Sequence, residues 1–317
     1  MKTYLLSTLI ALMFSVVFCR LLIPVLRRLK AGQNILVYVK EHTGKSGTPT
    51  MGGIAFITAG CLTAVLFLKQ VDRTTILCLA VGLAYMSVGV LDDFLKCKRK
   101  ENLGLKAWQK LLLQVALAVC CGTYCLRAGL TELHIPFFGK SYALGGWTFP
   151  LAVFVFIATV NAVNLTDGLD GLAAGTSVPF FLALGIIILL QNGSGSIALL
   201  SFCLTGALLG YLLFNVSPAS VFMGDTGSLA LGGFAAAIAT FTGNALYLLV
   251  IGGCFAFSVI SVLLQVIYYK ATGGKRIFLM APVHHHFQEK GHSESRISYA
   301  YFLVTFVLGG LCIVAIL

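Results

Sequence analysis

Long stretches without a charged residue recur along this chain, and they constrain its fold more than any other feature. A helix needs about 20 apolar residues to cross a bilayer. Stretches of single-span length lie at residues 3–19, 46–68, 74–91, 111–126, 141–166 and 297–317. Charged residues are only 10% of the sequence, whereas a soluble domain carries about 25%. The sequence therefore predicts an integral membrane protein.

Two longer apolar stretches are each predicted to hold two spans. Residues 171–224 are interrupted by the sequence QNGSGS at 191–196, which is typical of a turn, and residues 226–269 break near Gly243. The prediction is an all-α integral membrane protein with ten transmembrane helices in a single polytopic domain, residues 1–317. A short hairpin is expected in the loop at 131–150.

The basic residues predict the orientation, because cytoplasmic loops collect lysine and arginine. If the N-terminus is outside, ten spans leave most of the 22 basic residues in inner loops. The outer side then keeps only Lys2, Lys69, Arg73, Arg127 and Lys140. Both termini are therefore predicted to lie outside.

The net charge of +11 does not indicate nucleic acid, because the basic residues flank spans and form no basic domain. Anionic membrane lipid and anionic substrates are the expected partners. The ten cysteines include no CxxC pair and lie mostly within or beside apolar spans. Cysteine acts there as a small apolar residue, so we expect neither a metal nor a disulfide role for these residues.

Adjacent carboxylates close the third predicted span at Asp92 and Asp93. Such a pair is costly at a membrane boundary, because each charge disfavours ionisation of the other. A divalent cation would remove that cost. Taken alone, the pair is better interpreted as a helix-stop signal solvated by headgroup water.

The segment NAVNLTDGLDG at 161–171 places Asn161, Asn164, Asp167 and Asp170 three residues apart, at the start of the sixth predicted span. A helix would put them on one face. The intervening glycines also permit a turn whose backbone amides could meet an anion. The sequence leaves both conformations open, and either one concentrates polar groups.

Asp225 is predicted to open the eighth span, with glycine at 224 and 227. It could simply cap the helix. An N-cap does not need glycine on both sides, however, whereas a phosphate or metal that approaches the backbone closely does.

Consecutive histidines occupy the last inner loop at His284, His285 and His286. They cannot all face one metal from a helix or strand, so hydrogen bonding to phosphates is favoured over metal binding. The first inner loop contains Lys45 in a Gly-Lys-Ser sequence that resembles a P-loop only superficially, because Val39 stands where its first glycine should be.

The predicted topology places all these polar clusters on the cytoplasmic side. Carboxylates, amide-rich turns, lysines and histidines at one face are typical of magnesium-assisted phosphoryl transfer. An ion-coupled transporter is the alternative from another class. It predicts carboxylates near the middle of spans, and the spans here carry theirs at the inner ends.

The segments GTPTMGG (47–53), NLTDGLDG (164–171), FMGDTGS (222–228) and APVHHHF (281–287), with the Asp-Asp pair, resemble the phospho-N-acetylmuramoyl-pentapeptide transferases of the polyprenyl-phosphate sugar-phosphate transferase superfamily. The resemblance implies transfer from UDP-N-acetylmuramoyl-pentapeptide to undecaprenyl phosphate, which gives lipid I and UMP. It also implies Mg²⁺ as cofactor, a homodimer, and the bacterial inner membrane with a cytoplasmic active site. The triple histidine separates this family from a sister transferase that uses UDP-N-acetylglucosamine, which is the nearer alternative.

The resemblance also assigns roles to residues at matching positions. It implies that Asp92, Asp93 and Asp225 are catalytic, with Asp225 as the magnesium ligand. It implies that the donor is bound by Lys45, Asn164, Asp167, Asp170, Asn215, Phe222, His284, His285 and His286, with Phe222 stacking on uracil. One departure is Trp108, which lies between Lys106 and Lys110 where some relatives carry a lysine, so the role of that lysine is left unassigned.

Overall fold

The predicted spans are helices in the structure, a computed structural model that describes residues 1–29, 47–68, 72–99 and 104–317. The helices of the described part are α1 (Lys2–Arg28), α2 (Gly53–Phe67), α3 (Arg73–Arg99), α4 (Ala107–Arg127), α5 (Thr148–Thr166), α6 (Leu172–Leu190), α7 (Gly195–Asn215), α8 (Gly224–Phe241), α9 (Ala245–Ile251), α10 (Gly253–Ala271), α11 (Val283–Glu289) and α12 (Glu294–Val314). The expected turns at 191–196 and near Gly243 both separate helices.

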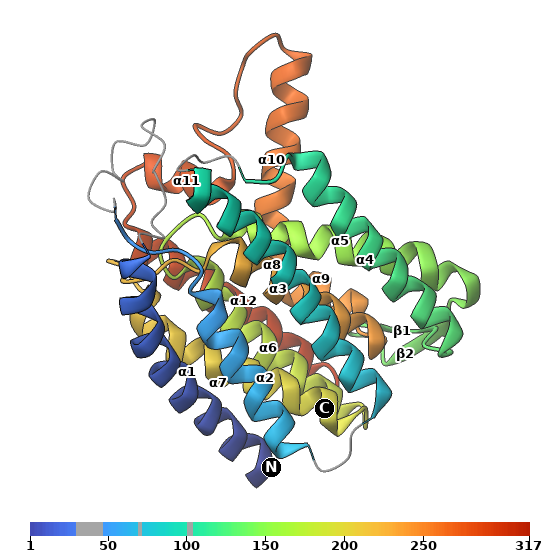
Figure 1. Cartoon of the computed structure of the whole chain (residues 1–317). Coiled ribbons are helices and arrows are strands. Elements are labelled where there is room, and N and C mark those ends of the chain that lie inside the picture. Colours follow the sequence, from blue (N-terminus) through green and yellow to red (C-terminus); the bar gives the residue numbers. More distant parts are fainter. Residues whose placement is uncertain (30–46, 69–71, 100–103) are drawn as a thin grey trace.

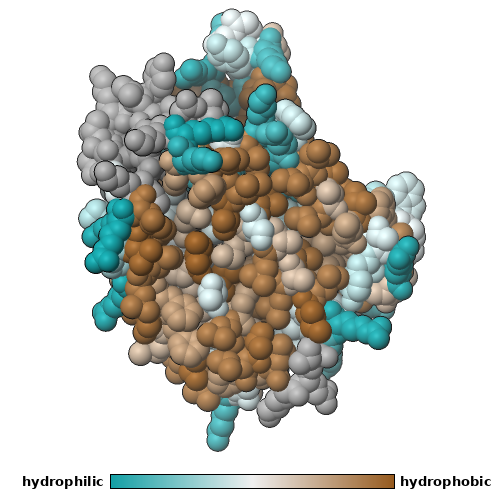
Figure 2. Space-filling model, in the orientation of Figure 1, coloured by the Kyte–Doolittle hydropathy of each residue, from teal (hydrophilic) through white to brown (hydrophobic). Residues whose placement is uncertain are grey.

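Eight helices of the described part are long and apolar enough to cross a membrane, namely α1, α3, α4, α5, α6, α7, α10 and α12. The shorter α2 has 15 residues and α8 has 18. Figure 2 shows a broad apolar band over the middle of the molecule, with hydrophilic residues gathered toward its two ends. The all-α membrane fold is thus confirmed.

The core is formed by α6, α7 and α8, while the helices around them expose much of their apolar surface. The most apolar window of α6 is 83% buried and that of α7 is 78% buried, against 22% for α10. Every residue of α8 except Asp225 is buried. Both termini lie at the end of the bundle away from α11 (Figure 1).

Glycines let α8 approach its neighbours closely, as small residues do at membrane helix contacts. A Cβ added at Gly89 of α3 would overlap the backbone of Asp225, and one at Gly53 of α2 would overlap Gly227. These contacts place the first turn of α8 directly against α3.

The loop at 131–150 folds as expected into an antiparallel hairpin of β1 (Glu132–Ile135) and β2 (Lys140–Ala143). A 3₁₀ turn, η2 (Gly145–Trp147), follows it. The hairpin is held against the α8–α9 turn, because the N–H of His134 donates to the carbonyl of Gly243 at 2.9 Å.

Two predicted helix ends are wrong. Asp92 and Asp93 do not close the third helix, because α3 continues to Arg99 with basic residues in its last turn, where they interact favourably with the helix dipole. Asp167 and Asp170 do not begin α6. Instead Asp167 follows the last residue of α5, and α6 starts after Gly171, whose φ of +72° favours glycine.

Candidate active site

A buried carboxylate cluster lies where α3 meets the first turn of α8. One oxygen from each of Asp92, Asp93 and Asp225 lies within 4.8 Å of the other two. Asp92 is 2% exposed and Asp93 is fully buried. Carboxylates this close, out of water, require positive charge beside them.

Two lysines supply that charge. The Nζ of Lys96, one turn after Asp92 on α3, lies 2.7 Å from oxygens of both Asp92 and Asp225. The Nζ of Lys110, from α4, lies 2.9 Å from Asp225. Three carboxylates and two ammonium groups leave one net negative charge. The cluster is therefore suited to a divalent cation, and oxygen ligands of this kind fit Mg²⁺.

Asp93 and Asp225 have different surroundings, since Asp93 is fully buried and Asp225 is partly exposed. Asp93 accepts hydrogen bonds from the N–H groups of Asp225 and Thr226 at 3.2 and 2.9 Å, and from the Thr226 hydroxyl at 2.7 Å. It therefore caps α8 from a neighbouring helix, as an N-cap side chain would. Asp225 instead turns its oxygens toward the lysines.

Asn164 joins α5 to this cluster. Its amide nitrogen donates to Asp225 at 2.6 Å and to the Ser228 hydroxyl at 2.9 Å, and its amide oxygen accepts from Lys110 at 3.2 Å. The structure thus places Asn164, a predicted site residue, in contact with Asp225 and Lys110. The prediction missed Lys96 and Ser228 and left Lys110 unassigned. The four-residue spacing of Asp92 and Lys96 was the available signal for Lys96.

Asp170 and Asn215 hold the α5–α6 turn against the segment that follows α7. A carboxylate oxygen of Asp170 accepts from the N–H of Ala219 at 3.0 Å. Asn215 accepts from the N–H of Gly171 at 3.2 Å and donates to the carbonyl of Val221 at 3.0 Å. Their side chains thus position the turn. Because these atoms already bind backbone groups, they are less available to contact a bound substrate directly.

Asp167 lies in the same turn, and its surroundings disfavour the charged form of its carboxyl. Burial, and then the charges of Asp225 and Asp93, raise its pKa to about 8. A protonated carboxyl can donate a hydrogen bond to an anion that its charged form would repel.

The three histidines of α11 face different neighbours. The Nε2 atoms of His284 and His285 approach Gly168 so closely that a Cβ there would lie 2.6 and 2.9 Å from them. His286 points elsewhere and accepts from the N–H of Leu279 at 3.0 Å. His284 is fully buried, and among the described residues neither of its ring nitrogens has a hydrogen-bond partner.

The segment containing Phe222 packs on the GTPTMGG segment. The N–H of Phe222 donates to the carbonyl of Pro49 at 2.8 Å, and its carbonyl accepts from Gly52 at 2.9 Å. The Phe222 side chain is half-buried. Lys45 lies outside the described residues.

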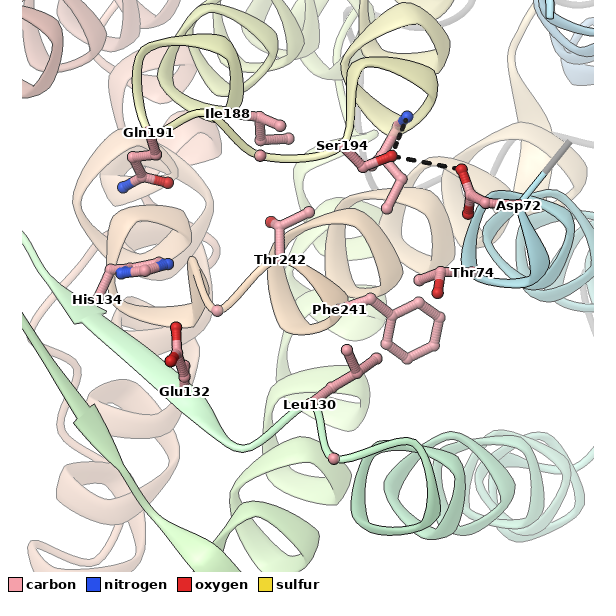
Figure 3. Close-up of a pocket in the computed structure, with 14 residues that line it drawn as sticks. Asp72, Thr74, Leu130, Glu132, His134, Ile188, Gln191, Ser194, Phe241 and Thr242 are labelled. Atoms are coloured by element: carbon pink, nitrogen blue, oxygen red, sulfur yellow. Dashed lines mark hydrogen bonds between the residues drawn. The ribbon is translucent and has the colours of Figure 1, made fainter. Parts of the chain in front are cut away.

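A cavity lies at the end of the bundle away from α11, and its acidic lining does not suit a phosphate. It encloses about 480 Å³ between the hairpin and the α6–α7 and α8–α9 turns (Figure 3). Its titratable lining residues are Asp72, Glu132 and His134, and no described lining residue is lysine or arginine. This lining does not favour an anionic ligand in the cavity.

An apolar groove of about 450 Å³ runs between α5 and the α9–α10 pair. Phe154, Leu249 and Leu263 line it, and Asn161 stands among the apolar residues. The amide nitrogen of Asn161 donates to the side-chain oxygen of Gln114 at 2.7 Å, so this polar group has a hydrogen-bond partner within the protein. The groove fits a hydrocarbon chain.

Known proteins are similar in sequence to this chain over nearly its whole length. A sequence model described as "Glycosyl transferase family 4" matches residues 74–243, and one described as "Phospho-N-acetylmuramoyl-pentapeptide-transferase signature 1" matches residues 45–57. Curated relatives named phospho-N-acetylmuramoyl-pentapeptide-transferase are 44% identical in Caldanaerobacter subterraneus subsp. tengcongensis and 43% identical in Bacillus subtilis. The first match covers 95% of both chains, and the second covers 98% of this chain and 95% of the relative. This chain belongs to the phospho-N-acetylmuramoyl-pentapeptide-transferase family.

Membership confirms the resemblance inferred from the motifs and the transferase class. A third relative, from Clostridioides difficile, is 42% identical over 98% of this chain and 97% of its own length. The family 4 match runs from α3 to the α8–α9 turn, so it contains the whole carboxylate cluster and both of its lysines.

Proposed function

We propose that this enzyme transfers phospho-N-acetylmuramoyl-pentapeptide from the UDP-linked donor to undecaprenyl phosphate, which releases UMP and forms lipid I. The observation that carries the proposal is the cluster of Asp92, Asp93 and Asp225 with Lys96 and Lys110, at the same end of the bundle as the histidine helix. Phosphoryl transfer between two anions needs positioning and charge neutralisation more than covalent chemistry, and this cluster supplies both.

Asp225 is the proposed magnesium ligand, since its carboxylate lies between both lysines and is anchored by Asn164. When bound, Mg²⁺ would neutralise the donor pyrophosphate. Asp93 orients Asp225 through the first turn of α8.

Lys96 and Lys110 are proposed to bind phosphate oxygens, and Asp92 to orient or deprotonate the acceptor phosphate. An acceptor phosphate oxygen attacks the sugar-linked phosphorus of the donor, the bond from that phosphorus to the bridging oxygen breaks, and UMP leaves. A two-step route through a phospho-aspartate is the rival mechanism.

The donor is proposed to lie between the carboxylate cluster and α11. The unpartnered nitrogens of buried His284, and the Nε2 of His285, face Gly168 beside Asp167 and can hydrogen-bond to donor oxygens. Phe222 offers a half-buried ring for the uracil. Lys45, Asp170, Asn215 and His286 remain proposed donor-site residues, the last three through the segments they hold.

The groove between α5 and α10 is proposed to hold part of the undecaprenyl chain. With α2 and α8 as further spans the protein crosses the bacterial inner membrane ten times, with both termini outside and the active site in the cytoplasm. We also propose that it works as a homodimer.

The experiment is UMP release by purified, detergent-solubilised protein given undecaprenyl phosphate with either UDP-N-acetylmuramoyl-pentapeptide or UDP-N-acetylglucosamine. Magnesium-dependent release from the muramoyl donor alone is expected. Release only from the N-acetylglucosamine donor would favour the sister transferase, and release from neither by folded protein would reopen the transporter alternative.

A further inference from the structure

A cleft of about 680 Å³ lies between the inner end of α10 and the segment 276–282, which we call the strap. Gln265, Tyr269 and Lys270 line it from α10, Arg276 and Met280 from the strap, and Glu289 from α11. None of these residues belongs to the carboxylate cluster. In Figure 1 this part of α10 projects beyond the neighbouring helices, beside α11.

The strap is fixed to both helices by specific hydrogen bonds. The Gln265 amide oxygen accepts from the N–H groups of Ile277 and Phe278, both at 3.0 Å, and its amide nitrogen donates to the Phe278 carbonyl at 3.1 Å. At the other side, Leu279 donates to His286. The cleft is therefore a built feature that adjoins the helix whose other histidines face Gly168.

Lys270 and Arg276 bring two positive charges to the cleft, against the one carboxylate of Glu289. In the described part of the chain, no carboxylate forms an ion pair with Lys270 or Arg276. Arg276 uses one N–H to bind the Leu279 carbonyl at 3.3 Å, which orients the guanidinium and leaves its other donors available. A guanidinium held this way, with an ammonium group lining the same cleft, fits a carboxylate.

We propose that this cleft binds the carboxylate-bearing peptide of the donor, with Arg276 and Lys270 as specificity-determining residues. The inference rests on the proposed function, and it goes further by assigning a place to the part of the donor that does not react. The apolar surfaces of Tyr269 and Met280 suit the side chains of a short peptide. A donor without peptide leaves the cleft empty, so the cleft distinguishes a peptidyl sugar from a plain one.

The test compares three donors on the full-length enzyme in non-ionic detergent: UDP-N-acetylmuramoyl-pentapeptide, the same donor with its terminal carboxylate amidated, and UDP-N-acetylmuramic acid without peptide. The variants are Lys270→Gln, Arg276→Gln and the double variant. Lys98→Gln is the matched control, because Lys98 is an exposed lysine in the last turn of α3.

We expect KM for the pentapeptide donor to rise about threefold in each single variant and about tenfold in the double variant, with kcat unchanged, as for partly exposed ion pairs. The amidated donor should show a smaller rise. The peptide-free donor and the Lys98 variant should show none.

Equal rises in KM for all three donors would overturn the proposal, because the cleft would then act on the shared nucleotide part. Unchanged KM values would also overturn it. A rise that appears only when phosphatidylglycerol is added to the detergent micelles would assign the cleft to anionic lipid instead. If the wild type releases UMP from no donor, the proposed function itself fails and this inference fails with it.

Discussion

The two aspartates that meet at the start of α8, Asp93 and Asp225, differ in what their oxygens contact. The carboxylate oxygens of Asp93 accept hydrogen bonds from N–H and hydroxyl groups of the first turn of α8, whereas the carboxylate of Asp225 contacts Lys96 and Lys110. The sequence predicted both as catalytic, because residue type and glycine neighbours do not reveal which lone pairs are occupied. Substitution by asparagine separates the two roles.

Asp225→Asn should abolish turnover, with UMP release reduced by about a thousandfold or more, as expected when a main source of charge stabilisation is removed. The protein should remain folded, since asparagine keeps the shape of the side chain. Retained activity in the purified variant would remove Asp225 as the metal ligand.

Asp93→Asn should lower stability first. Asparagine keeps one acceptor oxygen, so its new NH₂ group would face either the N–H of Asp225 or the N–H of Thr226, which leaves a buried donor unsatisfied at a cost of about 1–3 kcal/mol. The thermal unfolding midpoint in detergent measures this. A midpoint equal to that of wild type would mean that Asp93 does not cap α8.

At the scale of elements, α11 should detach as pH falls, because burial lowers the pKa of His284 to about 3. The unfolded histidine titrates near 6.5, so the neutral form favours docking fully above that value. Docking free energy is then lost progressively as pH falls from about 6.5 toward 3, while the detached loop takes up the proton.

Hydrogen exchange of the α11 amides, corrected for intrinsic rates, should therefore speed up between pH 7.5 and 5.5. His284→Gln should remove this pH dependence, and His292→Gln, outside α11, should keep it. Equal pH dependence in wild type and the His284 variant would contradict the assignment.

The contact between α3 and α8 also predicts an effect at a distance from any reacting group. Gly89→Ala would drive a methyl group into the Asp225 backbone, and such overpacking costs about 1–3 kcal/mol. We expect a lower unfolding midpoint together with strongly reduced UMP release. Gly310→Ala on α12 is the control, because its added Cβ has no neighbour within 4 Å. Similar behaviour of the two variants would argue against this packing.

At the scale of the whole molecule, sparse charge made the helices predictable, since each apolar stretch could be measured directly against a bilayer. The helix ends were less predictable. The α3 helix runs past the Asp-Asp pair because Lys96 contacts Asp92 and also Asp225, from a helix 129 residues further along the chain. No local pattern reveals the contact with Asp225, although the four-residue spacing of Asp92 and Lys96 does indicate their contact within α3.

The sequence also predicts the topology, and this is testable on the intact chain. Alkaline phosphatase, which is active only outside the cytoplasm, is fused after Gly139 in the hairpin turn or after Gly274 between α10 and the strap. These glycines lie at opposite ends of the bundle and each has open space beside it, so both fusions should be tolerated. Ten spans with both termini outside place Gly139 outside and Gly274 inside, because basic residues concentrate near the second. We expect activity from the first fusion only. Activity from the Gly274 fusion only would mean that the protein has the inverted orientation. The carboxylate cluster would then lie on the outer side, without access to a cytoplasmic nucleotide donor.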